Sequence, residues 1–73
     1  MKLPRIDARQ MISVLQKLKF KLSRQSGSHK IFKNESGVRV TVPFHSGKIL
    51  HPKIVKSVLR DCDLSIAEFL KLL

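Results

Sequence analysis

Apolar residues spaced three and four apart predict a helix near the start of the chain. They form one stripe, made of Ala8, Met11, Ile12, Leu15 and Leu18. Asp7 and Gln10 have the spacing of a capping box, in which two side chains satisfy backbone N–H groups at a helix start. We therefore expect a helix that begins after Asp7 and ends near Lys19.

Three short segments follow with the patterns of β-strands. Residues 20–23 and 38–42 alternate apolar with polar side chains, as half-buried strands do. Residues 29–33 are also strand-like, but Ile31 and Phe32 are adjacent and must point to opposite faces. The sequence therefore predicts three strands and leaves open which face of the middle one is buried.

Short polar segments at residues 25–28 and 34–37 predict tight turns, and short turns between strands favour an antiparallel meander. Pro52 suits the first position of a helix, which we expect to end near residues 61–63. A second capping box, residues 65–68, opens a last short helix. We predict one domain, residues 1–73, with an α+β two-layer sandwich: a three-stranded antiparallel sheet with helices on one face, in the order α-β-β-β-α-α.

The charge of the chain indicates what kind of partner it binds. Fifteen Lys and Arg residues stand against five Asp and Glu, a formal net charge of +10. Between Arg9 and Arg60 the only acid is Glu35. Such an excess of cations in a small domain favours a polyanion, most often nucleic acid, although a basic surface can also serve solubility alone. The lysines do not follow one amphipathic face, so we expect no membrane role.

His29 is the candidate catalytic residue. Gly27 allows a sharp turn that presents His29 at the start of a strand. An unperturbed histidine titrates near neutral pH, which suits a group that exchanges protons with a substrate. The alternative interpretation is a polar residue at a strand start with no further role.

Cofactor and metal chemistry find little support in the sequence. Cys62 is the only cysteine and lies on the apolar side of a predicted helix, where a free cysteine usually packs as a small hydrophobe. The histidines and the cysteine lack close-paired metal-ligand spacing. We expect no metal and no cofactor. The first residues lack an apolar run of signal-peptide length, so a cytoplasmic location is expected.

Two motifs and the element order resemble the HicA (YcfA-like) mRNA interferase toxins. These motifs are Gly27-Ser28-His29 and the segment Thr-Val-Pro-Phe-His-Ser-Gly-Lys at residues 41–48, followed by a Pro-led helix and a short Leu-rich one. The resemblance covers residues 3–73. It implies a double-stranded-RNA-binding-domain-like fold, mRNA cleavage with His29 as the catalytic histidine, and a HicB-like antitoxin that covers the basic face and His29. Many members carry Gly where this chain has Lys19.

Other residues near these motifs are candidates for RNA contact. Lys30 and Lys48 are candidates for phosphate binding and charge stabilisation, and Ser28 either binds phosphate or holds the turn. His45 is a candidate phosphate contact or second proton carrier, and otherwise a solvated loop residue. The function expected is that of a type II toxin, an endoribonuclease working by metal-independent histidine acid–base catalysis. The alternatives are a non-catalytic RNA-binding module and a degenerate toxin whose main ligand is an acidic protein.

Overall fold

The computed structural model describes residues 2–73 and has six regular elements. Their bounds are α1 (Ala8–Lys17), β1 (Lys21–Ser26), β2 (His29–Lys33), β3 (Arg39–Pro43), α2 (Pro52–Asp61) and α3 (Ile66–Leu72). The strands form one antiparallel sheet in the order β1-β2-β3. The predicted α+β fold and the predicted order of elements are confirmed.

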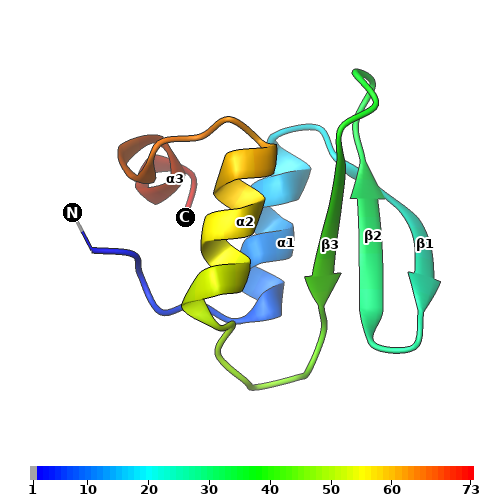
Figure 1. The fold of residues 1–73 in the computed structure, drawn as a ribbon, viewed down its shortest axis with the longest axis horizontal. Coiled ribbons are helices and arrows are strands. Elements are labelled where there is room, and N and C mark those ends of the chain that lie inside the picture. Colours follow the sequence, from blue (N-terminus) through cyan, green and yellow to red (C-terminus); the bar gives the residue numbers. More distant parts are fainter. Residues whose placement is uncertain (1) are drawn as a thin grey trace.

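The helices lie on the β3 side of the sheet. Figure 1 shows α1 and α2 next to β3, with β1 at the far edge and α3 on the other side of the helices. Every residue of β1 is exposed, so the prediction of a half-buried first strand is wrong. Leu22 is 51% exposed, whereas Phe20, just before the strand, is buried. Helices α1 and α2 therefore contact β3, at one edge of the sheet, and leave β1 at the other edge open.

The core fixes which face of the sheet is inward. Val40 and Val42 of β3 are buried. Arg39, which precedes them, and Thr41, which lies between them, are exposed. Phe32 is 3% exposed and pairs with Val40 across the sheet, so the buried face of β2 is the one that carries Phe32. Burial of these apolar side chains against the helices supplies the main driving force for the fold.

The helices bury most of the apolar positions that their spacing predicts. In α1, Ala8, Met11 and Leu15 are buried, together with Val14, which the predicted stripe omitted. In α3, Phe69 is fully buried, and Ile66 and Leu72 are half-buried against the core.

Side chains satisfy the free N–H groups at each helix start, as the sequence predicts. The Asp7 carboxylate accepts from the backbone N–H of Gln10 at 2.9 Å, and the Gln10 amide oxygen accepts from the N–H of Asp7 at 3.0 Å. Ser65 and Glu68 form the same reciprocal pair at the start of α3. Hydrogen bonds to Ser65 lower the pKa of Glu68, and the bond from the Ser65 backbone N–H is the larger cause.

The end of α1 is a Schellman motif with lysine at its left-handed position. The N–H of Phe20 donates to the carbonyl of Leu15 at 2.9 Å, and the N–H of Lys19 donates to that of Gln16 at 3.0 Å. Lys19 has φ of 69°, a conformation that normally favours glycine. The helix therefore ends here in the left-handed cap, with a side chain that strains it.

Lys19→Gly is expected to stabilise the domain by about 1 kcal/mol, because glycine adopts positive φ without a Cβ clash. For a domain of this size that raises Tm by roughly 4–8 °C. Thermal unfolding of the two proteins measures the shift. Thr41→Gly, at an exposed and extended position of β3, is the control and should lower Tm. An unchanged or lower Tm for Lys19→Gly would contradict the assignment of strain to this residue.

Candidate active site

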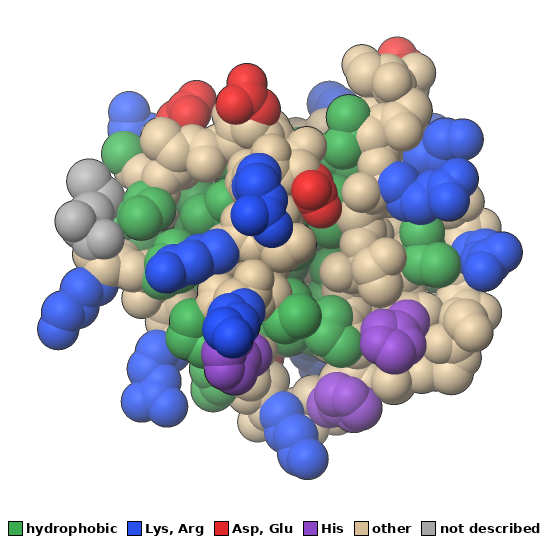
Figure 2. All heavy atoms as spheres, in the orientation of Figure 1, with side chains coloured by type: hydrophobic (Ala, Val, Ile, Leu, Met, Phe, Trp, Pro, Cys, Tyr) green, Lys and Arg blue, Asp and Glu red, His purple; other side chains and the backbone are tan. Residues whose placement is uncertain are grey.

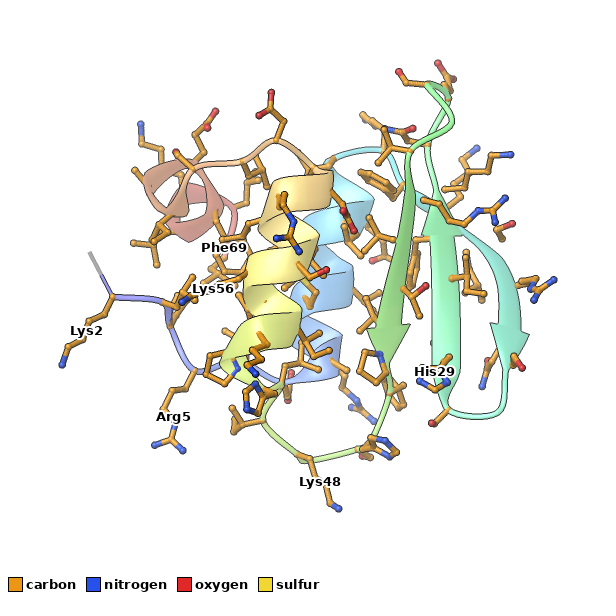
Figure 3. All side chains as sticks on the ribbon, in the orientation of Figure 1. Lys2, Arg5, His29, Lys48, Lys56 and Phe69 are labelled. Atoms are coloured by element: carbon orange, nitrogen blue, oxygen red, sulfur yellow. The ribbon has the colours of Figure 1, made fainter. Side chains whose placement is uncertain are left out.

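His29 is placed at the start of β2 by a two-residue turn. Ser26 and His29 face each other across the β1–β2 hairpin, with Gly27 and Ser28 between them. Gly27 has φ of 58°, as the first central residue of a type II′ turn requires. The turn leaves the His29 side chain exposed at the lower end of the strand in Figure 3.

The side chain of His29 lies on the open face of the sheet. Side chains alternate along a strand, so His29 shares a face with Ile31 and Lys33 and opposes the face of Phe32. The pairing across to β3 agrees, because His29 pairs with Pro43 while the buried Phe32 pairs with Val40. The candidate catalytic group is therefore on the face that the helices do not cover.

The loop after β3 meets the turn that carries His29. The backbone N–H of Phe44 donates to the carbonyl of Ser28 at 2.6 Å, which joins the two segments. Further along the loop, the N–H of Lys48 donates to the carbonyl of His45 at 3.1 Å, and both side chains are exposed. Figure 3 shows Lys48 and His29 toward the same end of the molecule. The fold thus gathers the segments that carry Ser28, His29, His45 and Lys48.

Lys30 points to the opposite face from His29. It is half-buried, and its Nζ lies 4.2 Å from the centre of the Phe44 ring, a cation–π contact. Phe44 is itself half-buried and packs against the core, which agrees with the role of an apolar loop anchor. The structure therefore separates Lys30 from His29, although the two are neighbours in sequence.

Cations occupy much of the open face. Figure 2 shows Lys and Arg side chains over the β1 and β2 side of the molecule as well as over the helices, with histidines nearer its lower edge. The register places Lys21, Arg24, Lys33 and Arg39 on the same face as His29. The sequence alone did not identify this set, because the adjacent Ile31 and Phe32 leave the register of β2 open. The alternation of Val40 and Val42 predicts the buried face of β3. Pairing β2 to β3 through a short turn would then have predicted which cations share a face with His29.

The neighbourhood of His29 is an open surface. One hollow, of about 800 Å³, lies at the other end of the sheet and is lined in part by Leu18, Phe20 and Asn34. A second, of about 370 Å³, lies between residues 3–5 and 49–52. His29 lines neither of them. An exposed face suits an extended polymer better than a small molecule, which binds best in a concave site.

Two other groups bear on the site's chemistry. Burial, and then the neighbouring Asp61 carboxylate, raises the pKa of Cys62 to about 11, so this side chain remains a thiol at neutral pH. His51 caps α2, where its Nδ1 accepts from the N–H of Lys53 at 3.0 Å. Within residues 2–73, no three His, Cys, Asp or Glu side chains are grouped closely enough to hold a metal ion.

Comparison with known proteins bears directly on this arrangement. The family model described as HicA toxin of bacterial toxin-antitoxin matches residues 8–64, which include the His29 turn and the loop after β3. The chain belongs to the HicA toxin family. It is therefore a toxin-family protein of a system in which toxin and antitoxin are paired. A search of curated proteins gives no significant match. Across residues 2–73, no helix of this HicA-family chain has the length and apolar character needed to cross a membrane.

Proposed function

We propose that the chain is the toxin of a type II toxin–antitoxin system and cleaves mRNA in the cytoplasm as an endoribonuclease. The observation that carries the proposal is His29, exposed on a cationic open sheet face within the region that matches the HicA family. A histidine can exchange protons near neutral pH, and the surrounding cations favour a phosphate-rich substrate.

RNA supplies its own nucleophile in the 2′-hydroxyl group. Attack by this oxygen on the adjacent phosphorus forms a 2′,3′-cyclic phosphate and releases the 5′-oxygen of the next nucleotide. His29 takes the proton from the 2′-hydroxyl or gives one to the leaving oxygen, and His45 is the candidate for the other transfer. Lys48 stabilises the negative charge that develops on the phosphate. Ser28 and Lys30 are the remaining proposed RNA contacts.

A HicB-like antitoxin is the proposed protein partner. Its binding surface would be acidic and would cover the cationic face and His29, so that RNA and antitoxin compete for the same residues. Membership of a toxin–antitoxin family supports a paired antitoxin, and the charge of +10 supports an acidic complement.

The test is cleavage of a single-stranded RNA by the purified chain in EDTA, beside the same strand with every 2′-hydroxyl methylated. The proposal predicts cleavage of the RNA and none of the methylated strand, because methylation removes the nucleophile. Cleavage of both strands would rule out attack by the 2′-hydroxyl. Binding of both without cleavage of either would favour the RNA-binding module instead.

A further inference from the structure

The open face of the sheet carries three cations directly across from one another. Lys33 of β2 pairs with Lys21 of β1 on one side and with Arg39 of β3 on the other. All three are exposed. Arg24, paired with Ile31, adds a fourth cation between this row and His29. None of the three strands contains Asp or Glu.

Such a row costs the folded protein stability. Like charges directly opposite each other in a sheet destabilise the pairing. The nearest acid along this part of the chain is Glu35, in the turn between β2 and β3. A bound anion with several charges would relieve the repulsion, so the row is better explained as a binding surface than as a packing device.

The row and His29 lie on one face and along one strand. Lys33 and His29 are four residues apart in β2, which corresponds to about 13 Å at the rise of an extended strand. We propose that this face, from the row of Lys21, Lys33 and Arg39 to His29, binds the phosphate backbone of single-stranded RNA and directs the strand to His29. The inference rests on the proposed nuclease function and names the surface that holds its substrate.

The composition of the face specifies how the RNA is held. Phe20, Phe32 and Phe69 are buried and Phe44 lies under Lys30, so the face offers no phenylalanine ring on which bases could stack. Binding therefore depends on phosphate contacts and should be strongly salt-dependent. A span of about 13 Å covers a few nucleotides, far less than the roughly 16 base pairs that modules specific for duplex RNA contact.

The test compares two variants that lose the same charge. The first carries Lys21→Gln, Lys33→Gln and Arg39→Gln on the sheet. The matched control carries Lys53→Gln, Lys56→Gln and Arg60→Gln, all exposed on α2. The probe is a fluorescent 2′-O-methyl RNA strand, which is not cleaved, and its affinity is measured by anisotropy between 50 and 200 mM salt, as is usual for such slopes. Thermal unfolding checks that the sheet variant is at least as stable as the original.

The sheet variant should bind about 100-fold more weakly at 100 mM salt, since each lost phosphate contact on a single strand removes about 0.7 from the salt slope. The slope of the logarithm of its affinity against the logarithm of salt concentration should fall in magnitude by about 2, while the affinity and slope of the control variant change little. Equal losses in both variants would show diffuse attraction only and overturn the proposal. Unchanged affinity in both would also overturn it and favour an acidic protein as the ligand of this face.

Cleavage of unmodified RNA, measured beside binding of the methylated probe, separates this inference from the proposed function. Loss of binding in the sheet variant, with no cleavage of unmodified RNA by the original chain, would support the binding surface and refute the nuclease. Cleavage of RNA with undiminished affinity and rate in the sheet variant would support the nuclease and refute the binding surface.

Discussion

His29→Ala is expected to lower RNA cleavage by at least about 100-fold, the usual contribution of a positioned acid–base group. The side chain is exposed at a strand start, so its removal should change the free energy of unfolding by no more than about 0.5 kcal/mol. Affinity for RNA should remain close to that of the original chain, because the cations of the open face are untouched. Cleavage rates at saturating RNA, together with a thermal unfolding curve, measure both effects.

His51→Asn is the matched control. His51 is also an exposed histidine near the end of the loop, but its Nδ1 caps α2. Asparagine is a good N-cap residue and should preserve the helix. We expect near-original cleavage from His51→Asn, and equal cleavage by both variants would refute the role assigned to His29.

Phe69→Ala should have the largest effect on stability, about 3–5 kcal/mol. Phe69 is fully buried, and it is the residue through which the short α3 enters the core. Domains of this size have total stabilities of roughly 4–11 kcal/mol, so the variant loses a large share of its stability. Tm should fall by about 15–30 °C.

Leu70→Ala provides the comparison within the same helix. Leu70 is 40% exposed, so its truncation leaves no closed cavity and should cost less than about 1 kcal/mol. Denaturant unfolding of both variants gives the two free energies. Similar losses would contradict the burial that the structure assigns to α3.

Local sequence signals predicted the elements well because each has its own physical cause. The capping boxes at Asp7 and Ser65, and the proline that opens α2, mark helix starts through groups within a few residues. The turns around Gly27 and Gly37 mark the hairpins through positive φ. Such signals depend only on residues close by in the same chain, so they can be recognised in a single sequence.

Burial in the sheet was harder to predict because it depends on distant elements. Leu22 alternates like a buried residue, yet it lies on an edge strand that the helices do not cover. Phe32, rather than Ile31, faces inward because β2 takes its register from β3, whose valines pack on the helices. The same register decides which cations share a face with His29.

The sequence therefore predicted individual residues of the site, but not which of their side chains share one surface. His29 and the loop from Pro43 to Lys48 were identified from their motifs, and the structure joins them through the hydrogen bond between Phe44 and Ser28. Lys30 was predicted to contact phosphate at the site, whereas strand alternation puts its side chain and that of His29 on opposite faces. Their roles in catalysis and RNA contact remain predictions.

The chemical ends of the cleavage products test the central claim most directly. The claim is that the RNA's own 2′-hydroxyl attacks its phosphate while His29 moves a proton. After digestion in EDTA, mass spectrometry should find 2′,3′-cyclic phosphate and 5′-hydroxyl ends, and the His29→Ala sample should contain neither above background. Products with 3′-hydroxyl and 5′-phosphate ends would show attack by water instead and would contradict the account.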